Sequence, residues 1–229
     1  GGKDSLYMFA HIMANIDRYP LDAVVHIKMP FDYPWIDNVM AYVKEKCEIL
    51  GIKYYEFTPR KTFEEEYNKY CYPSRIARWC NRSFKMDTLR DIDKAFPKNK
   101  VIRYVGLCAN ETSRVKDKDN EIYPLYEMGV FEETIWKWAK NQPLFNDYYK
   151  YNRRQGCMYC PMQDMNNSKY NSVYYPDIYN WYMKLAEESE KIISDKKGKP
   201  FSVWGAPKYN TEYRKNRISQ MELKEIERW

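Results

Sequence analysis

The chain has 229 residues, of which 44% are hydrophobic and 17% aromatic, and this composition excludes a disordered protein. Its 38 basic and 32 acidic residues leave a net charge of +6, a mild excess that suits a nucleotide or a nucleic acid but is equally usual on a plain protein surface. No apolar run approaches the roughly 20 residues of a membrane span, and no signal-peptide pattern opens the sequence, so we expect a cytoplasmic protein with no membrane partner.

The first half of the sequence alternates between helical and strand patterns. Apolar side chains at helical spacing predict a helix over residues 6–17, directly after a glycine pair. A short apolar run between two prolines predicts a buried parallel strand at 22–28. The same reasoning then predicts, in chain order, a helix at 36–50, a strand at 53–57, a helix at 62–70, a helix at 81–95 and a strand at 101–107.

The second half is mainly helical. It predicts a helix at 131–139, an irregular segment at 146–162 rich in Tyr, Arg and Cys, an amphipathic helix at 178–197 and a short helix at about 220–228. Because strands alternate with helices, the predicted fold class is α/β, an open parallel sheet with helices on both faces. We expect a nucleotide-binding domain over residues 1–165 and a helical C-terminal extension over 166–229.

Residues Gly1 to Ser5 read Gly-Gly-Lys-Asp-Ser and stand directly before the first predicted helix. A glycine turn at a helix N-terminus directs unpaired N–H groups and the positive end of the helix dipole to one point, which favours a phosphate. Lys3 can add a charge, and Ser5 a hydroxyl donor. We expect Lys3 and Asp4 to belong to a phosphate and metal shell rather than to the core. An ordinary capped turn is the alternative.

Glu111 and Arg114 follow the strand predicted at 101–107. Ligands of open α/β sheets bind at the carboxyl ends of the strands, so this position favours a binding role. Arg can hold a phosphate through two hydrogen bonds, and Glu can hold a magnesium ion or orient the Arg. A surface salt bridge is the alternative.

The sequence Cys157-Met-Tyr-Cys160 places two thiols close enough to ligate one metal atom or two corners of one cluster. In a reducing compartment this spacing favours metal or redox chemistry over a structural disulfide. Cys47 stands on a predicted helix among apolar neighbours, so we expect it in the core.

Five blocks of the sequence carry a resemblance to a known family. They are Gly1-Gly-Lys-Asp-Ser5, Pro30-Phe-Asp-Tyr-Pro34, Arg78-Trp-Cys-Asn-Arg-Ser-Phe-Lys85, Gly106-Leu-Cys-Ala-Asn-Glu-Thr-Ser-Arg114 and Arg154-Gln-Gly-Cys-Met-Tyr-Cys-Pro161. In this order they resemble the signature blocks of the phosphoadenosine phosphosulfate (PAPS) reductase family, within the PP-loop ATP pyrophosphatase superfamily. The first block is similar to the SGGKDS signature without its first Ser. The resemblance covers residues 1 to about 165.

This resemblance implies a Rossmann-like sheet of the adenine nucleotide alpha hydrolase type, whose first strand precedes Gly1 and is missing from the fragment. It implies an adenine nucleotide, ATP with magnesium, as substrate. The catalytic residues that it implies are Lys3, Asp4, Lys85, Glu111 and Arg114. The nucleotide-binding residues that it implies are Gly1, Gly2, Lys3, Asp4, Ser5, Asp32, Arg78 and Arg154.

The resemblance also extends the metal site. It adds Cys80 to the pair Cys157 and Cys160 as a third ligand, with Cys71 or Cys108 as the fourth. It favours an iron–sulfur cluster of the [4Fe-4S] type. Zinc is the rival for any set of four thiolates, and unligated thiols are the third option.

Two departures from the family pattern affect the substrate. Lys28-Met29-Pro30 stands where the family often has Asp-Thr-Gly, and Cys108 replaces the usual Arg, so contacts to the base, ribose or sulfonate are expected to differ. Sulfonucleotide reductases resemble this chain but carry a nucleophilic cysteine in a C-terminal motif, and this chain has no cysteine after Cys160.

The leading hypothesis is therefore an ATP-using enzyme that adenylates an acceptor and delivers sulfur from a cluster or a persulfide. A sulfur donor protein and a nucleic-acid acceptor are its expected partners. The alternatives are a sulfonucleotide reductase whose nucleophile lies outside the fragment, and a non-catalytic nucleotide or Fe–S sensor. Residues 208–217 interleave basic and aromatic side chains as nucleic-acid-binding segments do, with a solvated tail as the alternative.

Overall fold

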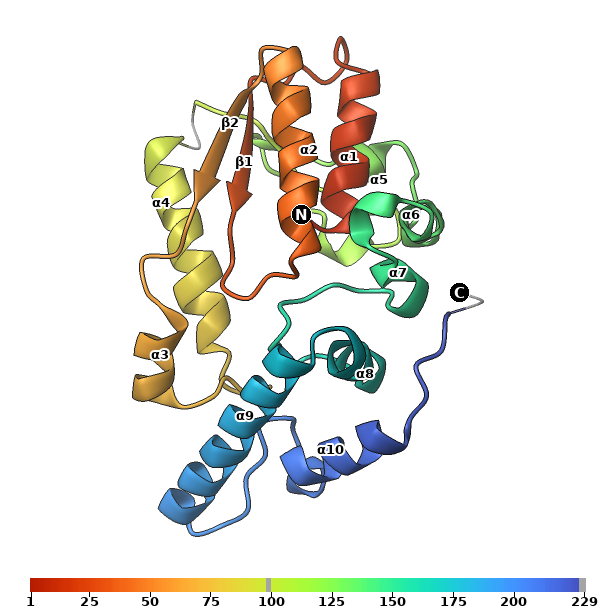
Figure 1. The fold of residues 1–229 in the computed structure, drawn as a ribbon. Helices are drawn as coiled ribbons and strands as arrows, with labels where there is room; N and C mark the ends of the chain where they lie inside the picture. Colours follow the sequence, from red (N-terminus) through yellow and green to blue (C-terminus); the bar gives the residue numbers. More distant parts are fainter. Residues whose placement is uncertain (98–99, 227–229) are drawn as a thin grey trace.

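The computed structural model describes residues 1–97 and 100–226 and shows a mixed α/β protein in which helices predominate (Figure 1). The strands are β1 (Ala23–Ile27), β2 (Lys53–Phe57), β3 (Arg103–Tyr104) and β4 (Glu121–Ile122). The helices are α1 (Lys3–Ala14), α2 (Trp35–Ile49), α3 (Phe63–Tyr70), α4 (Asp87–Ala95), α5 (Pro124–Glu127), α6 (Glu132–Lys140), α7 (Tyr148–Tyr151), α8 (Met165–Tyr174), α9 (Pro176–Lys197) and α10 (Thr211–Gln220). Shorter turns are the π-helix η1 (Asn81–Met86) and the 3-10 helices η2 (Thr112–Arg114), η3 (Pro143–Phe145) and η4 (Pro207–Tyr209). Within the described ranges, no helix is both long and apolar enough to cross a membrane.

The strands form two parallel pairs. β1 pairs with β2 so that Val25 lies opposite Tyr55, and β3 pairs with β4 so that Arg103 lies opposite Glu121. The expected parallel pairing is therefore present. In the described part of the chain, however, each sheet has two strands, and the expected single open sheet is not shown. β1 is hydrogen-bonded along one edge only, and Val25 on it is 39% exposed.

The strand predicted at 101–107 is shorter than expected. Only Arg103 and Tyr104 are assigned to it, and Val105 adds one further hydrogen bond, from its N–H to the carbonyl of Ile122. The chain then turns, because the N–H of Leu107 donates to the carbonyl of Val105 at 2.9 Å. The apolar pattern of this segment thus reflects the burial of Leu107 and not a long run of hydrogen-bonded strand residues.

The helices α1 and α2 lie side by side in the upper part of Figure 1 and enclose the main core. α1 buries Leu6 and Phe9, and α2 buries Val39, Val43 and Cys47 into the same cluster. Helix α2 lies within one residue of its predicted bounds, whereas α1 begins and ends three residues earlier than predicted, so that Lys3, Asp4 and Ser5 form its first turn. The apolar residues of both helices recur at helical spacing. The expected core position of Cys47 is confirmed, since its side chain is fully buried.

The helix predicted at 81–95 is present but begins as the π-helix η1 and continues as α4. Its first wide turn follows Cys80 directly, and it buries Ser83 and Phe84. The hydroxyl of Ser83 donates to the buried carboxylate of Glu66 on α3. Because π-turns occur frequently at functional sites, this distortion beside Cys80 directs attention to that cysteine.

Sequence periodicity missed α8 and placed the last helix wrongly. Both α8 and α10 are polar and start with side-chain caps: Asp164 accepts a hydrogen bond from the N–H of Asn167 at 2.8 Å, and Asn210 accepts one from the N–H of Tyr213 at 2.9 Å. The helix expected near 220–228 is not found in its described part, because α10 ends at Gln220 and residues 221–226 form no helix. Residues 227–228 lie outside the described ranges.

The C-terminal part packs tightly against the rest of the molecule. One core cluster combines Phe63 and Trp79 from the first part with Tyr182 and Ile218 from the second. The carboxylate of Glu190 on α9 is buried and accepts hydrogen bonds from the backbone N–H groups of Val203 (3.0 Å) and Thr211 (2.9 Å). The shared core cluster holds α9 and α10 against the segment that precedes residue 165, while Glu190 fixes the backbone at Val203 and Thr211 to α9.

Candidate functional site

The N-terminus of α1 is built from the glycine pair, the buried side chain of Tyr149 and the half-buried side chain of Gln155. The N–H of Lys3 donates to the hydroxyl of Tyr149 at 3.0 Å, and that hydroxyl donates to the side chain of Gln155 at 3.2 Å. A Cβ atom on Gly2 would lie 2.9 Å from the Gln155 side-chain oxygen, and one on Gly1 would lie 3.0 Å from Ile36. A side chain at either position would therefore crowd neighbouring side chains at the start of the helix, which favours glycine there.

Lys3 does not face an open phosphate position. Its side chain is 3% exposed, and its Nζ lies 2.8 Å from Asp4 Oδ1 and 3.3 Å from Glu132 Oε1. The expectation that Lys3 stays outside the core is wrong, because its ammonium group is buried between two carboxylates. Asp4 remains 38% exposed at its side chain. Glu132, the first residue of α6, is a member of this group that sequence reasoning missed.

Cys108 and Glu111 join the same group from the far side of α1. Cys108 Sγ lies 3.8 Å from Asp4 Oδ1, and the N–H of Cys108 donates to Glu111 Oε2 at 3.1 Å. Burial, followed by Asp4 and Glu111, raises the pKa of the Cys108 thiol to about 12. Glu111 also pairs with the exposed guanidinium of Arg114. The structure thus places Cys108 beside the glycine turn, among carboxylates.

The segment after β1 returns to the glycine turn and carries Asp32. Phe31 adopts a positive φ of 58°, and Asp32 Oδ2 accepts a hydrogen bond from the N–H of Met29 at 3.1 Å. Burial raises the pKa of Asp32 to about 6, against the opposing effect of its hydrogen bond from the N–H of Met29. Asp32 in turn raises the pKa of Cys157. It therefore lies between the glycine turn and the Cys157–Cys160 loop.

Cys80, Cys157 and Cys160 are electrostatic neighbours, which we call the three-thiol group. Burial raises the pKa of Cys157 well above its usual range, and Asp32, Cys160 and Cys80 raise it further. Burial and then Cys160 raise the pKa of Cys80 to about 11. The structure thus brings together the three cysteines that the family resemblance selected, and all of them are free thiols.

Hydrogen bonds from several elements fix the loop of Cys157 and Cys160. The N–H of Cys160 donates to the carbonyl of Cys157 at 3.0 Å, which closes the turn between them. The side-chain amide of Gln163 donates to the carbonyls of Cys157 (3.0 Å) and Met158 (2.8 Å). The N–H of Met158 donates to the carbonyl of Phe31 at 3.1 Å, so the loop is tied to the Asp32 segment.

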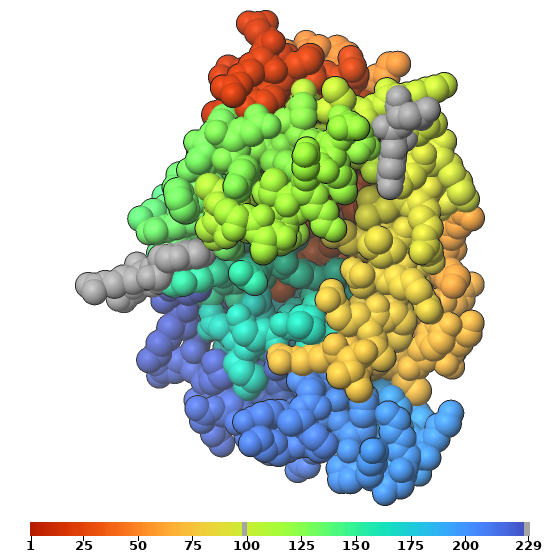
Figure 2. Space-filling view, turned by 180° about the vertical axis from the view of Figure 1, so that it is seen from behind, coloured from red at the N-terminus to blue at the C-terminus, as the bar shows by residue number. Residues whose placement is uncertain are grey.

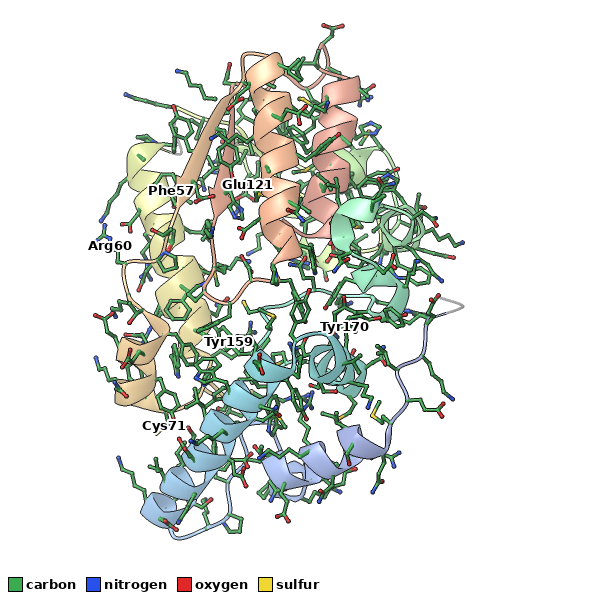
Figure 3. All side chains as sticks on the ribbon, in the orientation of Figure 1. Phe57, Arg60, Cys71, Glu121, Tyr159 and Tyr170 are labelled. Atoms are coloured by element: carbon green, nitrogen blue, oxygen red, sulfur yellow. The ribbon has the colours of Figure 1, made fainter. Side chains whose placement is uncertain are left out.

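Cys71 occupies a different position from the three-thiol group. It ends α3 with a positive φ of 60°, and its carbonyl accepts a hydrogen bond from the indole N–H of Trp79 at 3.0 Å. Figure 3 shows Cys71 at the end of α3 and Tyr159 nearer the middle of the molecule. Within residues 1–97 and 100–226, no three Cys, His, Asp or Glu side chains meet closely enough to hold one metal ion.

Basic side chains surround the three-thiol group and the glycine turn. Arg78 and Arg75 lower the pKa of Cys160 electrostatically against the larger effect of burial, and the Nε of Arg75 donates to the carbonyl of Pro161 at 3.2 Å. Lys85 on η1 is exposed and lies near Gly1. Arg154, with a side chain 84% exposed, lies 3.9 Å from Glu132.

The rear face of the molecule is hollowed near this group. Figure 2 shows a depression bordered by yellow atoms of the segment around η1 and α4, green atoms of the segment around η2, and teal atoms of the segment around the Cys157–Cys160 loop. Red-brown atoms of the N-terminal part of the chain lie at its floor. Two other hollows, one between α9 and the start of α10 and one between α2 and β2, contain none of the predicted site residues.

No protein-family model, curated protein or solved structure matches the chain.

Proposed function

We propose that the chain is an ATP-using enzyme of the PP-loop superfamily, similar to the PAPS reductases, that activates an acceptor and transfers sulfur to it. The observation that carries this proposal is the position of the Asp32 segment, which lies near Gly1 and is joined to the Cys157–Cys160 loop by the hydrogen bond from the N–H of Met158 to the carbonyl of Phe31 at 3.1 Å. A phosphate-binding turn and a thiol group thus adjoin each other. Activation by ATP followed by sulfur transfer needs both at one place.

The two strand pairs are, in this proposal, parts of one open parallel sheet. Both β1 and the segment after β3 lead at their carboxyl ends to the start of α1. A Cβ atom on Gly106 would lie 3.5 Å from the carbonyl oxygen of Asp4, and the segment after β1 carries Asp32 toward Gly1. In open α/β sheets, ligands bind at the carboxyl ends of neighbouring strands. This arrangement supports a nucleotide site at the glycine turn.

The reaction begins with attack of an acceptor oxygen on the α-phosphorus of ATP. The bond from that phosphorus to the bridging oxygen breaks, and pyrophosphate leaves with the electron pair toward the N–H groups of the α1 N-terminus. A sulfide sulfur then attacks the activated carbon of the acceptor, the carbon–oxygen bond breaks, and AMP leaves. Lys3 holds Asp4 and Glu132 in place, and the partly exposed Asp4 is positioned to bind the magnesium ion of the substrate.

The three-thiol group would hold an iron–sulfur cluster. A zinc ion with bonds of about 2.3 Å draws its sulfurs to about 3.8 Å from each other, whereas a cluster binds each thiolate through a different iron and accepts a wider set. Cys80, Cys157 and Cys160 act on one another electrostatically, which supports them as ligands of one such cluster. When bound, such a cluster supplies an iron that can hold sulfide. The raised pKa values of Cys80 and Cys157 mean that these residues release protons as they bind it.

Exposed basic side chains near the thiol group and the glycine turn support a polyanionic acceptor. Arg75, Arg78, Lys85 and Arg154 are all exposed and border the thiol group or the glycine turn. Exposed basic residues that track a backbone of phosphates are the usual footprint of nucleic-acid binding. We therefore propose a nucleic acid as the acceptor and a sulfur donor protein as the source of sulfide.

The test is an anaerobic assay of products. Protein incubated with ATP, magnesium, sulfide and RNA or DNA should release pyrophosphate and AMP and incorporate sulfur into the nucleic acid. Asp4→Asn should abolish both releases, while Asp17→Asn, an exposed site beyond the other end of α1, should leave them unchanged. Release of sulfite from a sulfonucleotide, with no pyrophosphate from ATP, would show that the chain is a reductase instead.

A further inference from the structure

Residues 67–86, which we call the basic segment, carry five of the 38 basic residues of the chain and none of its 32 acidic residues. All five are exposed: Lys69, Arg75, Arg78, Arg82 and Lys85. Within residues 1–97 and 100–226, none of them forms an ion pair, whereas Lys61 and Arg90 on either side of the segment pair with carboxylates. The basic segment therefore accounts for most of the net charge of +6.

The basic segment is held in a fixed conformation. Trp79 and Phe84 are buried in the core cluster that they share with α9 and α10. The indole N–H of Trp79 donates to the carbonyl of Cys71 at 3.0 Å, and Nε of Arg75 donates to the carbonyl of Pro161 at 3.2 Å. Like charges that are held close together repel each other, and an anionic partner relieves that repulsion.

Tyr70 places an exposed aromatic ring among these charges. Its side chain is 37% exposed at the end of α3. Lys69 Nζ lies 5.0 Å from the centroid of the ring, and Arg82 Cζ lies 5.5 Å from it. Both cations stand on long, exposed side chains, so a base can replace them on the ring while they pair with phosphates. Proteins bind single-stranded nucleic acids by this combination of aromatic stacking and basic side chains.

The other basic and aromatic stretch, residues 208–217, does not offer the same surface. Arg214 is buried, and Lys215 pairs with a carboxylate of α9. The exposed rings of Tyr209 and Tyr213 pack against each other, with centroids 5.4 Å apart. The two stretches have similar sequence patterns, but the structure leaves more unpaired positive charge on the basic segment.

The basic segment also adjoins the loop of Cys157 and Cys160. Arg75 bonds to the carbonyl of Pro161, the residue that follows Cys160. Figure 2 shows yellow atoms of the segment around η1 at the surface beside teal atoms of the segment around this loop. A nucleic-acid strand that lies along the basic segment therefore reaches the cysteine loop.

We propose that the basic segment binds a single-stranded nucleic acid, with one base stacked on Tyr70 and neighbouring phosphates paired with Lys69 and Arg82. This proposal rests on the proposed function only in taking the bound strand as the acceptor of sulfur. Bases of a duplex are already stacked on each other and are not available to Tyr70, so the single strand is the better partner. Stacking on one ring is tolerant of sequence, because every base has a π-face.

The first test is fluorescence anisotropy with the full chain, without ATP, and with labelled runs of deoxythymidine or uridine of about 12 nucleotides. Tyr70→Ala should weaken binding about tenfold, and Tyr70→Trp should retain it. The matched control is Tyr209→Ala, because Tyr209 is 45% exposed and carries Lys208 Nζ 5.0 Å from its ring centroid. Unchanged affinity in Tyr70→Ala, or an equal loss in Tyr209→Ala, would overturn the proposal.

The second test is the salt dependence of the same binding. Lys69→Gln and Arg82→Gln should each reduce the slope of log affinity against log salt concentration by about 0.7, whereas Lys208→Gln should leave it unchanged. These side chains are exposed, so the variants should unfold at the temperature of the unchanged protein, and they test the surface even if Tyr70→Ala does not fold. Equal slopes in all variants contradict the proposal, as does a duplex of the same length that binds as tightly as the single strand.

Measurement without ATP separates this proposal from the proposed function. Binding that depends on Tyr70, in a protein that releases no pyrophosphate from ATP, refutes the enzyme and leaves the surface standing. Release of pyrophosphate and AMP by a protein that binds neither oligonucleotide overturns the surface. Binding to anionic lipid vesicles and to neither oligonucleotide would also overturn it, in favour of a membrane partner.

Discussion

The buried ammonium group of Lys3 offers a direct test of how the glycine turn is built. In Lys3→Met the side chain keeps its approximate length but loses its charge, which leaves Glu132 (14% exposed) and Asp4 (38% exposed) facing each other. Removing one partner of a buried ion pair costs about 3–5 kcal/mol. Because Asp4 is more than a third exposed, solvent screens its share to at most about 1 kcal/mol. We therefore expect Lys3→Met to lower the free energy of unfolding by about 3 kcal/mol.

The assay is urea unfolding followed by tryptophan fluorescence, with the double variant Lys3→Met/Glu132→Gln as the decisive comparison. Glu132→Gln removes the more deeply buried of the two uncompensated charges. The double variant should therefore be more stable than the sum of the single changes predicts, by about 1–2 kcal/mol. If the two losses simply add, or if Lys3→Met costs less than about 1 kcal/mol, the ion pair does not hold the start of α1 and the reasoning is wrong.

Three further predictions concern the thiols, a strand histidine and the C-terminal helix. Cys157→Ser should remove the brown colour and iron of anaerobically purified protein, while Cys47→Ala should retain both; colour retained in Cys157→Ser would refute the ligand assignment. Burial lowers the pKa of His26 from 6.5 to about 4. Between pH 6.5 and 4, His26 therefore binds a proton in the unfolded chain but not in the folded protein. The free energy of unfolding should fall as the pH drops through this range, by less than about 3 kcal/mol after solvent screening. His26→Gln should flatten this part of the stability curve, and an unchanged curve would show that His26 is not responsible. Arg214→Leu should cost about 3 kcal/mol in thermal or urea unfolding because it leaves buried acceptors unpaired, against less than about 0.5 kcal/mol for the exposed Arg217→Ala.

The sequence predicted the elements whose apolar residues follow a clear period. The strand at 53–57 and the helix α2 lie where periodicity placed them, and α1 lies three residues earlier than predicted. The stability of these helices comes from burying one apolar face, which is what periodicity detects. Helix α10 escaped prediction because it presents few apolar residues and is fixed by a cap at Asn210 and by the burial of Arg214. Polar contacts of this kind depend on partners distant in sequence and leave no periodic signal.

The candidate site was predictable in part. Motif order selected Asp32, Cys80 and Cys157, and the structure makes them electrostatic neighbours. Motif order did not select Glu132. The one local signal for this residue is that it is acidic and stands in the first turn of a helix. The burial of Lys3 was also unpredictable, because a lysine in a glycine turn is expected to face solvent or a ligand. Lys3 is enclosed because Glu132 at the start of α6, more than a hundred residues further along the sequence, packs against it.

The C-terminal extension contributes to the rigidity of the cysteine loop. Arg214 on α10 is 5% exposed, and its guanidinium donates to the carbonyls of Gln163 (2.9 Å) and Asp164 (2.7 Å). Gln163 in turn donates through its side chain to the carbonyls of Cys157 and Met158. A chain of hydrogen bonds therefore leads from the last helix to a proposed ligand. Because ligands held by such outer contacts need less reorganisation when they bind a metal, loss of α10 should weaken the site even though α10 carries no cysteine.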